Sequence, residues 1–491
     1  MTTEASIENA LWSAADALRG SMDAGEYKNV ILGMLFLKFA SDVASARDEV
    51  PDEIDDDSPI ITVPSPARWQ YVSQHADNGD LAQALDSAMR EIESSNPNLR
   101  GALSTSYSRD ELDPGRLAQV FKLISDIHIS SIAEDRDVLG RVYEYFLMKF
   151  DMSYGSAAGE FYTPSEVVRL LVAMVQPFSG TVYDPCCGSG GMFVQSVNFA
   201  VAHGGNRSSV SIFGQEFNPT TWKLAKMNLA MKGVNCDVGS TWADTFSADQ
   251  HPTLRADYIL SNPPYNISYW DRNESDIRWD YGLPPTGNSN FAWLQHIAHH
   301  LAPGGTAAVV MANGTLTAAG SGEDAIRAKM VEGNIVDAIV TLPGQLFYTT
   351  AISVCVWILS RGRDGDNGER QRSGEVLFID ARDAGEMASR RTRRLTDHDI
   401  DRIANTYNSW RSLESTEYRD QLGFCRSVTT DDLCASNYLL NPGRFVGVVQ
   451  DDEHTVPIAE RVRVARDELL GLLKRGAELE TNLLKALTRH D

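Results

Sequence analysis

The sequence predicts an α/β protein with a doubly wound sheet at its centre, a helical domain before the sheet and a helical segment after it. Between residues 160 and 360, short apolar stretches alternate with helical ones, and three of these stretches lead into polar or glycine-rich turns. Alternation of this kind is typical of parallel strands joined by helices. Before residue 150 and after residue 450, apolar residues instead recur with the period of a helix.

The length and these changes of pattern predict four segments. A chain of 491 residues exceeds one ordinary domain of about 100–200 residues. We expect a helical N-terminal domain over 1–150 and a central α/β domain over 151–385. A C-terminal extension with a basic segment follows over 386–450, and a coiled-coil helix over 451–491.

The composition indicates a cytoplasmic protein. The six cysteines form no Cys-x-x-Cys pair, so neither a disulfide framework nor a metal site is expected. The N-terminus lacks the pattern of a signal peptide, and no apolar run reaches the roughly 18 residues that cross a membrane. The formal net charge of −23 is unfavourable for phosphate binding. A nucleic-acid substrate therefore requires a local basic patch or a partner that supplies one.

In the N-terminal domain, residues 11–18 and residues 31–39 each place three apolar side chains on one helical face. The acidic stretch 51–64, bounded by two prolines, predicts an exposed loop. A second helical run covers about 115–150.

In the central domain, the apolar stretches predict strands at 181–183, 210–213, 258–260, 306–311 and 335–342. The apolar stretch 351–359 follows the last of these after a connection too short for a helical crossover. It therefore predicts a hairpin and an antiparallel strand at the edge of the sheet. The polar, glycine-rich segment 363–374 predicts a flexible loop.

In the last segment, apolar or small residues recur at alternating spacings of four and three, which is the pattern of a heptad seam. Its members are Ile458, Val462, Ala465, Leu469, Leu472, Gly476, Leu479 and Leu483. The seam predicts a helix that either packs on its own protein or docks on another subunit.

Three motifs at strand ends carry the chemistry. The first, Asp184 to Met192, follows a predicted strand and contains Gly188, Ser189 and Gly190. Glycines allow a sharp turn and the close approach of a ligand to the backbone. The spacing of a dinucleotide-binding loop and the lysine of a P-loop are both missing.

Two acids follow the next segments of the sheet. Glu216 stands at the end of the second strand, where a carboxylate accepts hydrogen bonds from ribose hydroxyls, although a solvated loop acid is the alternative. Asp244 follows a third segment and could accept a hydrogen bond from an adenine amino group.

The third motif, Asn262-Pro263-Pro264-Tyr265, follows the strand at 258–260. Two prolines stiffen the loop and remove two backbone donors, which leaves the Asn262 side-chain oxygen and the Pro263 carbonyl as acceptors. Two acceptors that hold the protons of a base amino group favour its attack on a methyl group and stabilise the positive charge that develops. The ring of Tyr265 can stack on a base rotated out of a duplex. A rigid turn without chemistry is the alternative.

The stretch before the glycine loop, Gly159 to Pro164, precedes an amphipathic helix expected at 165–176. Thr163 and Pro164 suit the start of a helix. The stretch could also form a lid over a cofactor.

In this order, the motifs resemble those of N6-adenine DNA methyltransferases. Flanking segments are similar to those of modification subunits of type I restriction–modification systems, over about residues 5–445. They include 11–28, 137–145 and 342–349. Three positions depart from the family pattern: Tyr265 for a frequent phenylalanine, Cys186-Cys187 for small residues, and Ala351-Ile352-Ser353 for Gly-Ile-Pro.

The resemblance implies a class I methyltransferase fold and S-adenosyl-L-methionine as cofactor. It implies that the catalytic residues are Asn262, Pro263, Pro264 and Tyr265. The implied cofactor-binding residues are Glu160, Phe161, Tyr162, Thr163, Pro164, Ser165, Asp184, Gly188, Ser189, Gly190, Glu216 and Asp244. The implied partners are double-stranded DNA, a specificity subunit flanked by two modification subunits, and a restriction subunit that can join them. A partner that binds DNA would also explain the net charge.

Candidates for phosphate contacts are Arg390, Arg391, Arg393 and Arg394, although a solvated run of charges is equally compatible. Two other functions stay open: a methyltransferase for glutamine side chains, which uses the same loop, and a scaffold that keeps the fold without activity. The choice of adenine over cytosine depends on motif order and resemblance, because two acceptors suit either amino group.

Overall fold

The computed structural model describes residues 13, 24–49, 61–76, 79–109, 112–126, 163–347, 351–365, 369–389, 392–413, 418–448 and parts of 462–479. The chain divides into two compact units, Met1–Gly447 and Val448–Asp491. The apolar face predicted at 11–18 and the predicted helical run beyond 126 lie outside the described residues.

The N-terminal part of the first unit is helical, as expected. Its helices are α2 (Ala24–Glu49), α3 (Trp69–Ser73), α4 (Leu81–Ser95) and α5 (Pro114–Ser125), with the short turns η1 (Ser65–Ala67) and η2 (Pro97–Leu99). The expected helix with an apolar face at 31–39 is present as α2, but all residues from Val30 to Ser41 are buried. Helices buried on every side form the centre of a core, and α3, α4 and α5 pack around α2.

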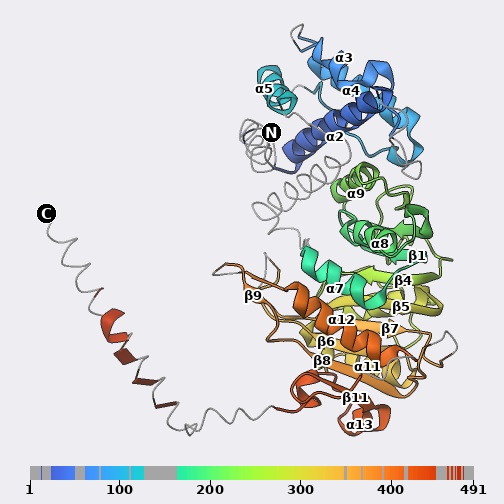
Figure 1. The fold of residues 1–491 in the computed structure, drawn as a ribbon, viewed down its shortest axis with the longest axis vertical. Coiled ribbons are helices and arrows are strands. Elements are labelled where there is room, and N and C mark those ends of the chain that lie inside the picture. Colours follow the sequence, from blue (N-terminus) through green and yellow to red (C-terminus); the bar gives the residue numbers. More distant parts are fainter. Residues whose placement is uncertain are drawn as a thin grey trace. The chain divides into compact units, whose positions relative to one another are not determined.

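A nine-stranded sheet forms the centre of the rest of the first unit (Figure 1). Its strands are β1 (Gly180–Asp184), β2 (Val210–Gly214), β3 (Cys236–Asp237), β4 (Ala256–Ser261), β5 (Leu301–Ala312), β6 (Val336–Thr341), β7 (Val354–Ser360), β8 (Glu375–Asp380) and β11 (Cys425–Thr429). The order is β11-β8-β6-β7-β5-β4-β1-β2-β3. Strands β3, β2, β1, β4 and β5 run parallel to one another, whereas β7 is antiparallel to both β5 and β6.

The segment predicted as an antiparallel edge strand does not lie at an edge. As β7 it pairs antiparallel with β6, as expected, but it is inserted between β6 and β5, and all seven of its residues are buried. A strand that is apolar on both faces is suited to the interior of a sheet. The antiparallel edge strand is β11, which pairs with β8.

Helices cover both faces of the sheet, which confirms the doubly wound fold. One face packs against α7 (Ser165–Val175), α8 (Gly191–Ala202), α9 (Pro219–Met231) and α12 (Asp397–Arg411). The other packs against α10 (Asn290–His300), α11 (Glu323–Glu332) and α13 (Thr430–Ala435). Strand residues alternate between the two cores: Ala308 and Val310 belong to the first, Ala307 and Val309 to the second.

Helix α9 joins the helical domain to the sheet. Trp222 and Leu229 face the sheet core, whereas Leu224, Met227 and Met231 belong to the core of the N-terminal helices. The apolar sequence of α9 is therefore explained by burial on both sides.

The segment predicted as a flexible loop at 363–374 is anchored at both ends. Arg363 and Arg372 are almost fully buried, and both contact Asp337 on β6, at 2.9 Å and 3.1 Å. The Arg363 contact is an ion pair without the alignment of a hydrogen bond, whereas Arg372 Nε donates a hydrogen bond. Tyr407 on α12 donates a third contact to Asp337, at 2.7 Å.

Candidate active site

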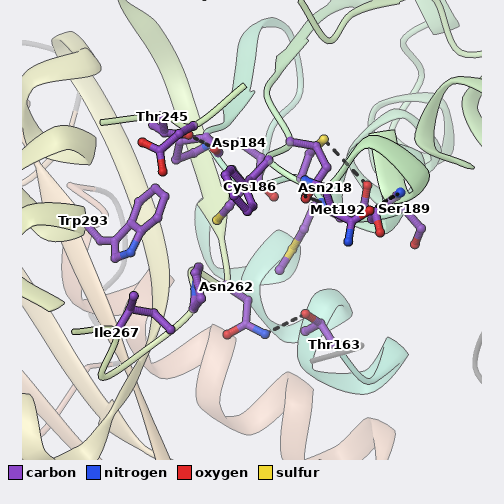
Figure 2. A pocket seen from close by; sticks show the side chains of 18 of the residues that line it. Thr163, Asp184, Cys186, Ser189, Met192, Asn218, Thr245, Asn262, Ile267 and Trp293 are labelled. Carbon is purple, nitrogen blue, oxygen red and sulfur yellow. Dashed lines mark hydrogen bonds between the residues drawn. The ribbon is translucent and has the colours of Figure 1, made fainter. Parts of the chain in front are cut away.

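The carboxyl ends of β1, β2 and β4 meet at a cavity of about 760 Å³ (Figure 2). Ligand sites in α/β proteins lie at this end of the strands, and small-molecule pockets have volumes of about 300–1,000 Å³. The predicted site residues that line the cavity are Thr163, Ser165, Asp184, Gly188, Ser189, Glu216, Asp244, Asn262 and Pro264. Four other predicted residues that the structure describes are not part of this lining: Pro164, Gly190, Pro263 and Tyr265. Glu160, Phe161 and Tyr162 lie outside the described residues.

The glycine loop turns the chain from β1 into α8. Gly188 and Gly190 have φ values of +56° and +83°, a left-handed conformation that favours glycine. A Cβ atom at Gly190 would lie 3.1 Å from Leu229, so α9 also requires a glycine there. At Gly188, by contrast, no atom lies within 4 Å of such a Cβ, so the backbone stays open to a ligand.

Asp184 is buried at the end of β1. Its Oδ1 accepts hydrogen bonds from Ser261 Oγ at 2.7 Å and from the Cys186 amide at 3.1 Å. Burial raises the pKa of Asp184 to about 6, because it penalises the charged form more than these hydrogen bonds favour it. The Cys186 thiol lies beside it, and burial together with the Asp184 charge raises the pKa of this thiol well above its ordinary value.

The two other acids are held by backbone amides. Glu216 is 9% exposed; it accepts from the Gly188 amide at 3.0 Å and from the Asn218 amide at 2.8 Å. The carboxylate thereby ties the second strand end to the glycine loop. Asp244 Oδ1 accepts from the amides of Phe246 and Ser247, at 2.8 Å and 3.0 Å.

Arg278 supports the Asp244 loop from below, a role that no motif indicated. This nearly buried side chain donates to the carbonyls of Thr245 at 2.8 Å and Phe246 at 2.6 Å, and pairs with Asp276 at 2.5 Å. Its position depends on the irregular segment 266–289, where sequence periodicity gives no signal.

An aromatic cluster forms one wall of the cavity. The ring of Phe246 lies 4.4 Å from that of Trp293 on α10 and 4.9 Å from that of Trp270. Both tryptophans line the cavity and are almost buried. In the sequence, only the closely spaced tryptophans of 270–293 indicated an aromatic wall at this place.

The Asn262 amide is held from both ends. Its Nδ2 donates to Thr163 Oγ1 at 2.9 Å, as Figure 2 shows, and its Oδ1 accepts from the Tyr265 hydroxyl at 2.9 Å. Thr163 was expected to cap α7, but Pro164 occupies the N-cap position and no side chain caps this helix. The ring of Tyr265 packs against the sheet core.

Two of the four predicted phosphate contacts are described, and both lie on a small hairpin of β9 (Glu386–Met387) and β10 (Arg393–Arg394). Arg393 Nη1 donates to the Ala384 carbonyl at 3.0 Å, and Arg394 pairs with Glu386 at 2.6 Å. Arg390 and Arg391 lie outside the described residues.

A cluster of two buried histidines and an aspartate lies next to Arg278. Asp249, His296 and His300 offer ligand atoms within 4.8 Å of one another. Each ring nitrogen already faces a polar neighbour: His300 faces Asp249 and Leu254 O, and His296 faces Tyr183 and Arg278. The Arg278 charge opposes a cation here, so these contacts favour a hydrogen-bond network, which Arg278 connects to the Asp244 loop.

Comparisons with known proteins agree with this geometry. A model of the N-6 DNA methylase family matches residues 134–454, and a model of the HsdM N-terminal domain matches residues 7–124. The HindI type I restriction enzyme methylase subunit of Haemophilus influenzae is 40% identical over 448 residues, which are 87% of this chain and 99% of that protein. The MjaIX methylase subunit of Methanocaldococcus jannaschii is 31% identical over 98% of this chain and 91% of that protein.

A solved structure is also similar. The type I restriction-modification methyltransferase subunit from Streptococcus thermophilus superposes with a TM-score of 0.72 at 26% identity. The superposition covers 90% of this chain and 99% of that one.

Proposed function

The chain belongs to the N-6 DNA methylase family, as a methylase subunit of a type I restriction–modification system, and from this premise we propose how its cavity works. It transfers the methyl group of S-adenosyl-L-methionine to the N6 amino group of adenine in DNA. One observation carries the assignment of the site: Asn262 and the three acids at the strand ends line the same cavity.

The cavity fits S-adenosyl-L-methionine, which supplies a methyl group bound to a positively charged sulfur. Glu216 is placed to accept from ribose hydroxyls, and the second oxygen of Asp244 to accept from the adenine amino group. The open backbone at Gly188 leaves room for the ligand, and Asp184 offers a negative charge to a cation. Thr163 to Ser165 bring the start of α7 to the same cavity, which supports a contribution from 160–165.

Asn262 holds the amino group of the target base. An amide oxygen has two lone pairs, so Oδ1 can accept from the base while it accepts from Tyr265. The Pro263 carbonyl is the second acceptor. Thr163 and Tyr265 fix the amide plane, so the acceptor costs little reorganisation when charge develops on the nitrogen. Stacking of the Tyr265 ring on the base remains our proposal from the sequence.

We propose that a specificity subunit binds the DNA and brings it to the cavity. In the unit Val448–Asp491, the described residues Val462, Leu470, Leu473 and Leu479 are each more than half exposed, which supports docking on another subunit. We propose two methylase subunits for each specificity subunit, with a restriction subunit able to join. The arginines proposed to contact the phosphates are Arg390, Arg391, Arg393 and Arg394. Of these, Arg394 also forms an ion pair with Glu386.

The test is methyl transfer by the complex co-purified with its specificity subunit. Asn262→Ala should lower kcat by about 100- to 1,000-fold, as the loss of one preorganised polar group does, and leave cofactor binding intact. Asn235→Ala, at an exposed asparagine, should behave as the wild type. Label in protein instead of DNA, or full activity of Asn262→Ala, would contradict the assignment.

A further inference from the structure

The loop that follows the catalytic residues presents one aromatic side chain to the mouth of the cavity. Tyr269 is 99% exposed, yet it is one of the residues that line the cavity with Asn262 and Pro264. Its φ of +62° lies in the left-handed region that side chains rarely adopt. A large aromatic ring held in water at a strained position requires an explanation other than folding.

The loop is anchored on both sides of this tyrosine. The amide of Asn266 donates to Asn290 Oδ1 at 2.8 Å, and Asn290 Nδ2 donates back to Asn266 Oδ1 at 3.0 Å. On the other side, Trp270 is almost buried, and its Nε1 donates to the Pro285 carbonyl at 3.1 Å. The exposed ring is therefore carried by a fixed backbone.

A base beside Asn262 needs an apolar surface on this side of the cavity. The Tyr265 ring is oriented by its hydrogen bond to Asn262 and packs partly on the sheet core, so it offers one surface to the base, whereas Tyr269 exposes a second ring. Ile267, which is 39% exposed, lies on the opposite side of Asn262 from Thr163 in Figure 2. Tyr269 and Ile267 thus extend the wall of the cavity towards the solvent from which DNA must approach.

We propose that Tyr269 stacks on the target adenine after it leaves the duplex and holds it in the cavity mouth, with Ile267 against its edge. The inference rests on the proposed function, because it places the amino group of the base at Asn262. An aromatic face stacks on any base, so Tyr269 captures the base without reading it. Unstacking a base from a duplex is unfavourable, and a ring ready at the mouth offsets part of that cost.

The experiment measures methylation by the complex with its specificity subunit, on a duplex that carries the mapped methylation site. Tyr269→Ala should lower kcat/KM for DNA by roughly 5- to 100-fold, the range found when one base–aromatic stack is removed. Tyr269→Phe should stay within about twofold of the wild type, because it keeps the ring. Ile277→Ala is the matched control: this residue is exposed on the same loop but lies outside the cavity lining.

Two further measurements separate stacking from a structural effect. The cofactor Kd of Tyr269→Ala should equal that of the wild type. A target adenine opposite an abasic site leaves the duplex more readily, so it should restore part of the lost activity. If Tyr269→Ala matches Ile277→Ala, or if the abasic site restores nothing, the inference is wrong. Failure of the proposed function is distinguishable, because then the wild-type complex or Asn262→Ala would already give the contradictory result.

Discussion

At the scale of single residues, Asp184 is held in an unusual protonation range. It is buried beside a thiol and a serine hydroxyl, and its pKa is raised to about 6. A carboxyl group whose pKa is raised in the folded state destabilises the fold when ionised. This penalty is absent below the ordinary pKa of an aspartate, near 4, and is fully present above pH 6. Retaining the acid there is consistent with its proposed charge for the cofactor.

The charge of Asp184 should make cofactor binding depend on pH. The affinity for S-adenosyl-L-methionine should fall as the pH decreases through about 6, because the carboxylate then loses the charge that attracts a cation. Calorimetric titration between pH 5 and 8 measures the effect. Asp184→Asn should bind more weakly at pH 8 and show no step near pH 6. A step of equal size in Asp184→Asn would assign it to another group.

The same substitution should stabilise the empty protein. Asp184→Asn removes an ionised group from a buried position and keeps an acceptor for Ser261, so the free energy of unfolding at pH 8 should rise by about 1–2 kcal/mol. Urea denaturation at pH 8 and pH 5 measures it, and at pH 5, which lies between the ordinary pKa near 4 and the raised pKa of about 6, the gain should fall to about half. A loss of stability at pH 8 would contradict the account.

The motifs predicted those parts of the site that are contiguous in sequence. Asp184, Glu216, Asp244 and Asn262 each follow a segment of the sheet, so parallel strands bring them to one edge. The role of Arg278 could not be predicted, because it donates hydrogen bonds to two carbonyls that are more than thirty residues away in the sequence. The contact between Asn262 and Thr163 was missed for the same reason, because the two residues are 99 positions apart and Thr163 suited the start of a helix.

At the scale of elements, an acidic residue in an apolar strand joins three parts of the fold. Asp337 on β6 contacts Arg363, Arg372 and Tyr407, all in a buried environment. Burial opposes its ionisation, but the two guanidinium groups and the Tyr407 hydroxyl outweigh it, so the pKa of Asp337 lies below its ordinary value. Its stabilisation is therefore present at neutral pH and is lost as the pH falls through that lowered pKa.

Removal of this carboxylate should be among the most damaging changes in the sheet. Asp337→Ala leaves two buried cations without a counter-charge, and we expect a loss of about 3–5 kcal/mol in the free energy of unfolding. Urea denaturation at pH 7.5 measures it. Arg394→Ala, which removes an exposed ion pair with Glu386, is the control and should change nothing measurable. Equal stability of Asp337→Ala and the wild type would show that the cluster contributes nothing.

Elements were predictable where the signal is local. Apolar runs located β1, β2, β4, β5 and β6, because buried parallel strands are apolar throughout. An apolar run does not indicate which strands become neighbours in the sheet, so the position of β7 between β5 and β6 was not predicted. Strand β11 escaped notice because only two of its five residues, Cys425 and Val428, are buried. The segment 363–374 looked flexible because its arginines find their partner in a distant strand.

At the scale of the whole molecule, the described cavity belongs to the first unit alone, and the second unit carries the surface proposed for assembly. The chain has 44 basic and 67 acidic residues, and this excess of acids favours a partner that contributes to DNA binding. The four proposed segments remain predictions at their boundaries; residues 386–447 supply α12 and β11 to the first unit.

Truncation should separate cofactor binding from assembly. The chain 1–447 should unfold at the same urea concentration as the full chain and bind S-adenosyl-L-methionine with the same Kd, because the cavity lies within it. It should no longer co-purify with the specificity subunit. The double substitution Val462→Glu and Leu479→Glu in the full chain should reproduce this loss, because it places charges at two exposed positions of the seam. A truncated chain that still assembles would move the docking surface to the first unit.

The insertion of β7 also dictates an order of events during translation. The ribosome completes β5 at Ala312, but its neighbour in the sheet is not finished until Ser360, after α11 and β6 have emerged. Until then, the parallel half has an apolar strand with one unpaired edge, which is a template for pairing with other chains. The nascent chain therefore exposes an unpaired apolar strand edge over this interval, and closure of the sheet waits for a strand that must enter between two others.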